Sequence, residues 1–231
     1  MSIAATTSLS PEGTTPMTPR RFTATLAATA ALALAATACG SDTTGTEQFT
    51  APTTTAPDLD AAPAALTWRT VGGVSVPRSP IDGPRGGSGV TGSGYSQTPQ
   101  GAVLAAINGQ TALAVAGDRA WAEVANTVTA PGPGRDAYAL ARTAVTVSGT
   151  VPADRAPAFV GFEVTDYDTE RFTAAVSVAQ TIGGDDQLYS YPVALQWLDD
   201  DWRIVLPTAD DAIDATELES LDGYTALEPS S

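Results

Sequence analysis

Apolar and polar residues alternate through the stretch from Ala158 to Pro207, and this alternation predicts four consecutive antiparallel strands. Because successive side chains of a strand point to opposite sides, each strand has one apolar face. Turns are expected at residues 166–170, at Gly183-Gly184-Asp185 and at Asp199-Asp200. The expected core-facing residues are Val160, Phe162 and Val164; Phe172, Ala174, Val176 and Val178; Tyr189, Tyr191, Val193, Leu195 and Trp197; Trp202, Ile204 and Leu206. Such a sheet needs helices to cover its apolar face, and these must come from upstream.

The chain between about Thr98 and Val147 carries the helical pattern. Thr98-Pro99 is typical of a helix start, with Thr98 as N-cap and Pro99 at the first helical position. Two adjacent stripes follow at helical spacing, so that one side of the helix can lie on the sheet. The residues of these stripes are Val103 and Ile107 in one, and Leu104, Thr111 and Val115 in the other. Gly117 is expected to end this helix.

A second helix is expected to follow, with Asp118 as its cap and the Pro-Gly-Pro-Gly run of residues 131–134 as its end. Trp121, Val124 and Val128 lie at helical spacing within it. A third segment covers residues 135–147, and its last part fits either a helix or an extended chain because β-branched residues favour strands. The predicted fold class is α+β: a curved antiparallel sheet of about four to six strands packed by two or three N-terminal helices.

The N-terminal segment is typical of an exported protein. Arg20-Arg21 precedes an uncharged run from Phe22 to Ala38, which ends in small residues directly before Cys39, the single cysteine. The run is mostly Ala and Thr, which is weakly apolar for a membrane span. The residues around Cys39 resemble a bacterial lipobox, with Ala36 where Leu is usual, which implies cleavage between Ala38 and Cys39 and diacylglycerol on the thiol. An exported free thiol is the alternative, and the start codon is Met1 or Met17.

These patterns divide the chain into four parts. Residues 1–38 are predicted to be a lipoprotein signal peptide, and residues 39–63, rich in Thr, Pro and Ala, a disordered tether. Residues 64–207 are predicted to form the α+β domain. Residues 208–231 are predicted to be an acidic C-terminal tail, with a short helix around residues 213–221.

The composition excludes several functions. The 231-residue chain has 26 acidic residues against 11 basic ones, all Arg, no His, and a net charge of -15. Such a charge repels phosphate backbones, so we expect no nucleic-acid partner. Without histidine no Ser-His or Cys-His pair exists, and without lysine the glycine-rich residues 83–94 do not make a Walker loop. We therefore expect no catalytic residue and no cofactor.

Two groups of side chains are candidates for binding. Asp199-Asp200-Asp201, or the acids of the turn at residues 166–170, are candidate ligands of a hard cation, but the EF-hand spacing is absent and solvated turns are the expectation. A metal site is therefore not predicted. Four aromatic residues of the last two strands are candidates for lining a pocket on the concave face of the sheet, with plain core as the alternative. They are Tyr189, Tyr191, Trp197 and Trp202.

Three short runs carry a resemblance to a known group of proteins. They are residues 94–106 (GYSQTPQGAVLAA), Gln196-Trp197 with Asp201-Trp202-Arg203-Ile204, and Leu221-Asp222-Gly223-Tyr224. The chain resembles a poorly characterised family of actinobacterial exported lipoproteins that are often found with conjugative mobile elements. The resemblance implies a cystatin-like or nuclear transport factor 2-like domain over about residues 66–227, and it implies no catalytic residues.

The function expected from these patterns is that of a non-enzymatic lipoprotein. It would be held at the extracytoplasmic face of the cell membrane, with the lipid bilayer as one partner through the diacylglycerol on Cys39. Its domain would contact an envelope protein, as an accessory component of a conjugation or surface apparatus. The alternative is a module that binds a small molecule or a cell-wall ligand in a pocket of the sheet, and an open cavity of a few hundred Å³ would favour it.

Overall fold

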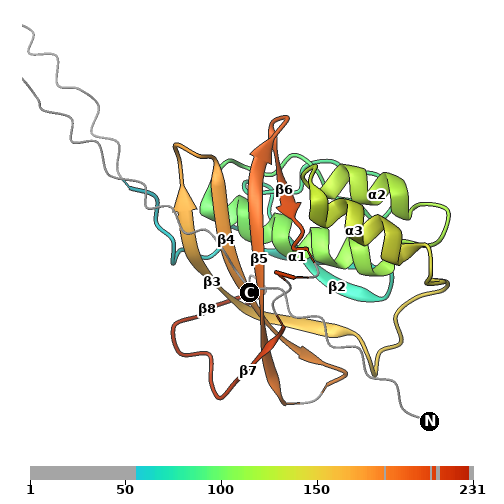
Figure 1. The fold of residues 1–231 in the computed structure, drawn as a ribbon. Coiled ribbons are helices and arrows are strands. Elements are labelled where there is room, and N and C mark those ends of the chain that lie inside the picture. Colours follow the sequence, from blue (N-terminus) through green and yellow to red (C-terminus); the bar gives the residue numbers. More distant parts are fainter. Residues whose placement is uncertain (1–55, 185, 209, 212–213, 229–231) are drawn as a thin grey trace, which may run out of the picture. The chain divides into compact units, whose positions relative to one another are not determined.

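The computed structural model describes residues 56–184, 186–208, 210–211 and 214–228 (Figure 1). The described part has an α+β fold, as predicted. A β-hairpin comes first, three helices follow, and a large antiparallel sheet completes the chain. The elements are β1 (Thr67–Val71), β2 (Val74–Arg78), α1 (Pro99–Val115), α2 (Trp121–Val128), α3 (Pro133–Arg142), β3 (Pro157–Asp168), β4 (Thr173–Ile182), β5 (Leu188–Leu198), β6 (Asp201–Val205), β7 (Thr216–Leu218) and β8 (Thr225–Ala226).

The large sheet is open, antiparallel and six-stranded. Its strand order is β6-β5-β4-β3-β8, and β7 pairs with the other end of β5. The four strands predicted between residues 158 and 207 are therefore confirmed as β3 to β6. The register places Leu195 opposite Ile204 and Trp197 opposite Trp202, as the alternation requires. The turn at Asp199-Asp200 has positive φ at both residues (52° and 59°), which is the geometry that joins two strands with two residues.

Two predicted core positions are wrong because the strands are irregular there. In β3, Phe159 is buried while Val160 is half-buried, since the register shifts between Phe159 and Gly161 and displaces the alternation by one residue. Phe172 precedes β4 in a turn, with φ of 56°, and its side chain is exposed. The other predicted positions of β4, Ala174, Val176 and Val178, are buried as expected, and Ala179 and Gln180 after them are buried as well.

Helix α1 lies at the centre of the fold and is covered on nearly all sides. It begins as predicted, because Thr98 Oγ1 accepts a hydrogen bond from the Gly101 N–H at 3.0 Å and Pro99 is in the first turn. It contacts β3 to β6 on one side and the β1–β2 hairpin and α2 on others. Both predicted stripes are therefore buried. Gly109 allows a close approach to β6, since an added Cβ would lie 2.7 Å from Ile204 Cδ1.

Helices α2 and α3 follow α1 on the same side of the molecule (Figure 1). Helix α2 has the predicted residues, but Ala120 is its N-cap and Asp118 does not cap it. The Asp118 carboxylate instead accepts hydrogen bonds from Arg142 and from the Val147 N–H. Helix α3 begins at Pro133, inside the run that was expected only to end the preceding helix, and residues 145–147 have no regular structure.

The folded part starts before residue 64, so the predicted boundary there is wrong. Leu59 packs against the core, Pro63 is buried, and the Gln100 side chain donates to the Asp58 and Ala61 carbonyls at 2.9 Å each. The Ala64 N–H donates to the buried carboxylate of Asp82 at 2.9 Å. The first residues of the predicted tether, 39–55, lie outside the described part, whereas the chain from Asp58 onward belongs to the domain.

The predicted acidic tail is also part of the fold. Strand β7 pairs with β5, and β8 pairs with β3 at Gly161 and Phe162. Tyr224 donates its hydroxyl to Ser190 Oγ at 2.7 Å, and Leu227 is buried. Over the described residues 214–221, a short strand and a bend replace the predicted helix.

Candidate functional site

A cavity of about 560 Å³ lies where β6 ends, between the second half of α1, the α2–α3 connection and the neighbouring strand β5. Figure 1 shows α3 beside β6, at this side of the sheet. Most of its lining is apolar. The residues that shape it are Leu113 of α1, Pro131 and Pro133 of the connection, Ala194 of β5, Val205 of β6, and Leu206. Its volume is in the range of sites that bind small molecules.

One wall of the cavity is the α2–α3 connection, which crosses the free edge of β6. Thr129 forms a parallel bridge with Ile204, and the Ala130 N–H donates to the Ile204 carbonyl at 2.8 Å. Gly134 then packs directly on the Leu206 carbonyl, because any Cβ at this position would lie 1.8 Å from that oxygen. The two prolines carry no N–H, so they present apolar rings to the cavity without a backbone donor.

The sheet contributes small side chains to the cavity. Ala175 of β4 and Ala194 of β5 are paired neighbours, and Ala194 is paired with Val205 of β6. All three line the cavity and lie on the face opposite Leu195 and Ile204, which point to α1. Because these residues are short, the space over this part of the sheet is open to a ligand.

Few polar groups reach the cavity. Its polar side chains are those of Gln110, Arg135, Thr165, Thr208 and Asp211. Asp211 accepts a hydrogen bond from Thr208 Oγ1 at 2.7 Å. The side chains of Arg135 and Gln110 have no hydrogen-bond or ion-pair partner among the described residues. The N-cap of α3 is Gly132, which supplies no side-chain cap to the first turn of that helix.

The lining of the cavity is suited to binding a ligand. Histidine does not occur in the chain, and the cavity holds one hydroxyl next to a carboxylate, the hydrogen-bonded pair of Thr208 and Asp211. Within the described ranges no group of three or more His, Cys, Asp or Glu residues could hold a metal ion. Non-covalent binding of a mainly apolar molecule is the chemistry that this lining supports.

The four aromatic residues that were candidates for a pocket do not line this cavity. They lie on the other face of the sheet, toward α1, and the alternative interpretation as core is correct for Trp202. Its side chain is buried, with ring centroids 5.4 Å from Trp197 and 5.9 Å from Tyr167. Trp197, Tyr189 and Tyr191 are half-buried on the same face.

Two of the runs that carry the family resemblance meet in space. The Asp201 carboxylate accepts hydrogen bonds from the Gly94 and Tyr95 N–H groups at 2.9 and 3.1 Å. Trp202 Nε1 donates to the Ser96 carbonyl at 2.9 Å. Both contacts fix the chain that enters α1 onto the start of β6, so the two runs have a structural role. Tyr95 is buried, which raises the pKa of its phenol above the ordinary value.

The acidic turns do not form a cation site in the described part of the chain. The Asp201 carboxylate accepts hydrogen bonds from three backbone N–H groups, those of Gly94, Tyr95 and Trp202. Asp168 accepts from the Arg171 and Glu170 N–H groups and pairs with the Arg171 guanidinium at 3.1 Å. These interactions lower the pKa of Asp168, with the Arg171 N–H as the main cause.

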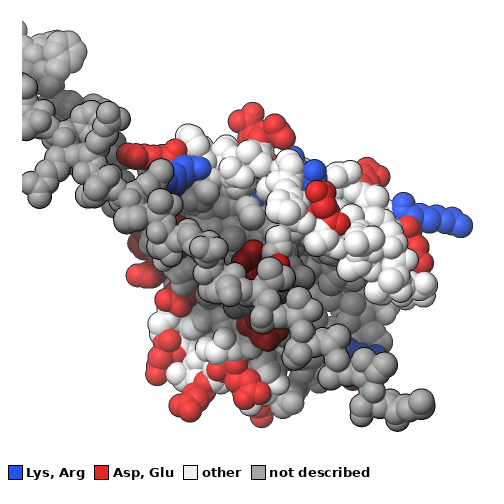
Figure 2. All heavy atoms as spheres, in the orientation of Figure 1, with Lys and Arg blue, Asp and Glu red and all other residues white. Residues whose placement is uncertain are grey.

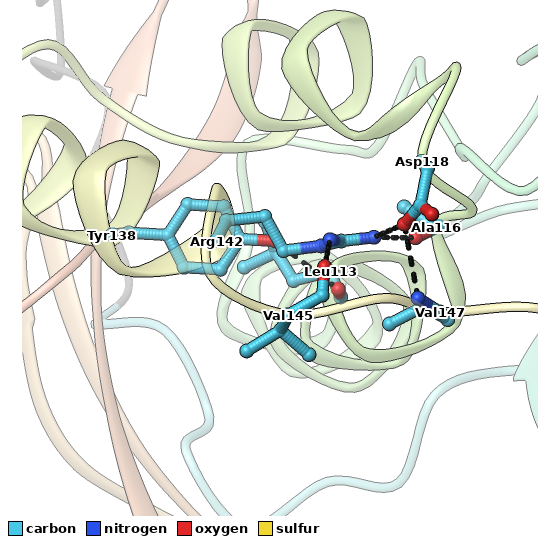
Figure 3. A network of polar contacts seen from close by, with 7 residues as sticks. All are labelled: Leu113, Ala116, Asp118, Tyr138, Arg142, Val145 and Val147. Atoms are coloured by element: carbon cyan, nitrogen blue, oxygen red, sulfur yellow. Dashed lines mark hydrogen bonds and ion pairs between the residues drawn. The ribbon is translucent and has the colours of Figure 1, made fainter.

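A polar network around Arg142 holds the helices together (Figure 3). Arg142 is buried and donates to the carbonyl of Ala116 at the end of α1, to the Val145 carbonyl and to Asp118. A cation at this end of α1 is favourable because helix dipoles are negative there. Tyr138 donates its hydroxyl to the Leu113 carbonyl at 3.2 Å, and burial raises its pKa. No local sequence pattern predicts this network, because its members are far apart in the chain: Ala116 and Arg142 are separated by 26 residues.

The predicted lipidation and cleavage residues, Cys39 and Ala38, lie outside the described residues. Among the helices of the described part, none is long and apolar enough to cross a membrane.

The fold and the cavity define an α+β domain with an open antiparallel sheet and a mainly apolar cavity at its edge. The chain belongs to a family that is characterised by a domain of unknown function (DUF8175), whose model matches residues 24–226. Comparisons with curated proteins and with solved structures gave no significant match.

Proposed function

We propose that this protein is a lipid-anchored, extracytoplasmic binding protein whose domain takes a mainly apolar small molecule into the cavity at the end of β6. The observation that carries the proposal is the cavity itself: about 560 Å³, open, and lined by prolines, alanines and aliphatic side chains. The sequence favoured a protein-interaction domain, with ligand binding as the alternative. An open cavity of this size favours ligand binding.

The proposed location rests on the sequence. An apolar export segment that ends in small residues before a single cysteine supports lipid attachment at Cys39. The family match spans this segment as well as the domain. The resemblance to nuclear transport factor 2-like domains, in which helices wrap a curved sheet, is part of the same proposal.

A neutral fluorescent probe tests the cavity. N-phenyl-1-naphthylamine should bind the purified protein saturably, with one site per chain. Ala194 lines the cavity from an exposed strand position, so Ala194→Trp should fill it and weaken the affinity by about tenfold or more. Thr70 is also exposed on a strand but does not line the cavity, which makes Thr70→Trp the matched control. Equal probe affinity in all three proteins would refute the proposal.

Contact with an envelope protein is a second candidate, and one surface favours it. Leu140 of α3 and Val145, three residues after the end of that helix, are 77% and 55% exposed. Large apolar side chains exposed near one another in sequence are candidates for a protein-interaction surface. If a partner with an apolar surface binds here, Leu140→Glu should abolish its co-purification after cross-linking in cells, whereas Thr150→Glu, at an exposed site in the next loop, should not.

A further inference from the structure

The side chains at the cavity also indicate what kind of polar group its ligand carries. We infer that the ligand is a single-chain amphiphile with an anionic head group, a carboxylate or a phosphate, and that Arg135 binds this head. The inference rests on the proposed function, because it assumes that the cavity is a ligand site. It adds the charge of the ligand and the residue that selects it.

Arg135 is the only basic residue that lines the cavity, among the described residues. It is half-buried, and its guanidinium has no acceptor in the described part of the chain. Arg142 and Arg171 are each paired with an aspartate. Arg69 also has guanidinium atoms without a partner, but it does not line the cavity. A guanidinium presents several donors in a fixed plane, a geometry that suits carboxylate and phosphate oxygens. An anionic head placed beside Arg135 would supply the acceptor that it lacks.

Two neighbouring features bear on this charge. Asp211 also lines the cavity, but its side chain is exposed, so solvent screens its charge. Its carboxylate also accepts a hydrogen bond from Thr208. Arg135 is in the first turn of α3, where the N-terminal end of the helix adds partial positive charge. Asp136, the next residue of that turn, is exposed and does not line the cavity, so the positive charge that a bound head group would meet is that of Arg135.

The rest of the lining suits an alkyl chain. Leu113, Pro131, Pro133, Val205 and Leu206 offer carbon surface, and the proline nitrogens offer no donor. Each methylene that leaves water on this surface should strengthen binding by about fourfold. A ligand with one apolar chain and one charged end could place the chain against these residues and the charged end beside Arg135.

Four probes with the same ten-carbon chain and different heads test the inference: decanoate, decyl phosphate, decanol and decyltrimethylammonium, each below its micelle concentration. Competition with N-phenyl-1-naphthylamine gives the affinity of each. In the wild type, decanoate or decyl phosphate should bind about tenfold more tightly than decanol, and decyltrimethylammonium most weakly. The order of the two anions identifies the carboxylate or the phosphate as the preferred head.

Variants then assign the head to Arg135. Arg135→Gln should reduce the affinity for the anionic probes to that for decanol and leave decanol unchanged, and Arg135→Lys should restore part of the loss. Arg155→Gln removes one positive charge at an exposed site outside the cavity and should change nothing. If decanol and the anions bind the wild type equally, the inference fails and the cavity proposal stands. If no probe binds and N-phenyl-1-naphthylamine does not bind either, both fail.

Discussion

Trp202 and Arg203 are adjacent in β6 and have opposite surroundings. Trp202 is 4% exposed, packs on Trp197 and Tyr167, and donates its indole N–H to the Ser96 carbonyl. Arg203 points to the other face of the sheet and is half-buried, with one hydrogen bond of 3.4 Å to the Asn126 carbonyl. The predicted register of the strand is therefore correct, and it separates a core residue from a peripheral one.

The two residues should differ strongly in their contribution to stability. Trp202→Ala should lower the free energy of unfolding by about 3–5 kcal/mol, because it removes buried ring surface and leaves a cavity. Arg203→Ala should cost less than about 1 kcal/mol, since its single hydrogen bond is long. Urea unfolding of both variants and the wild type measures the difference. A larger cost for Arg203→Ala would contradict the register.

Asp118 should make stability depend on pH. The Val147 N–H is the main cause that lowers the pKa of its carboxyl, followed by the hydrogen bond from Arg142. A carboxyl whose pKa is lower in the folded chain contributes stability above its unfolded pKa of about 3.9 and loses it as the pH falls through the folded value. Asp118→Asn should therefore reduce the melting temperature at pH 7.

The difference between wild type and Asp118→Asn should shrink as the pH is lowered below about 4, where the wild-type carboxyl becomes protonated. Thermal melts from pH 7 to pH 3 measure it. Asp222→Asn is the control for the loss of one negative charge, because its side chain is exposed and has no partner in the described part. A constant difference over the whole range would show that Asp118 acts through shape and not through charge.

At the scale of elements, the strands and helices with regular periodicity could be predicted. Strands β4 to β6 pair without a register shift, and Thr98-Pro99 marks the start of α1 by a cap whose geometry the structure reproduces. The failures have local physical causes. The register shifts in β3 insert residues that no period-2 pattern shows, and Phe172 was assigned to a strand although its backbone adopts a turn conformation.

The edges of the domain were missed for another reason. Strand β8 has two residues, β7 has three, and both lie in an acidic stretch without alternation. Pairing with a preformed strand holds them in place, and backbone hydrogen bonds leave little trace in a sequence. The same is true of residues 58–64, which are attached by Leu59, Pro63 and hydrogen bonds from Gln100.

The cavity could not be predicted either. Its main wall is the Pro-Gly-Pro-Gly run of residues 131–134, whose local signal is only that a helix ends. Its floor is formed by Ala175 and Ala194, which are too small to attract notice in a hydrophobic pattern. The aromatic residues that did attract notice belong to the opposite face. A cavity depends on which elements meet, and that information is absent from single-chain periodicity.

The N-terminal edge gives a test of where the domain begins. A chain that starts at Ala64 loses the buried Pro63, the packing of Leu59 and both acceptors of Gln100. It should be less stable than a chain that starts at Ala56 by about 1–3 kcal/mol, from the loss of apolar burial and hydrogen bonds. Urea unfolding compares the two, with Gln100→Ala in the longer chain to isolate the hydrogen bonds. Equal stability would restore the boundary that the sequence suggested.

At the scale of the molecule, charge is unevenly placed. Figure 2 shows acidic side chains without basic ones over the lower end of the view, where Figure 1 places β7 and β8. Over α2 and α3 the same view shows both acidic and basic side chains among uncharged ones. With a net charge of -15, the protein is repelled by anionic lipid head groups. Attraction by charge therefore does not account for membrane attachment, and a covalent anchor is needed if the protein stays there.

The anchor is predicted at Cys39, because it is the single cysteine and directly follows the apolar run from Phe22 to Ala38. A diacylglycerol on its thiol supplies two acyl chains, which suffice for stable attachment, whereas one chain binds only reversibly.

Cys39→Ser should move the protein from the membrane fraction to the soluble fraction. Washing the wild-type membranes with 1 M salt should release nothing, since salt weakens only electrostatic binding. Mass analysis of the wild type should find a chain that begins at Cys39 and carries acyl groups. If wild type and Cys39→Ser partition alike, or the mature chain carries no acyl group, the protein is held by other means or not held at all.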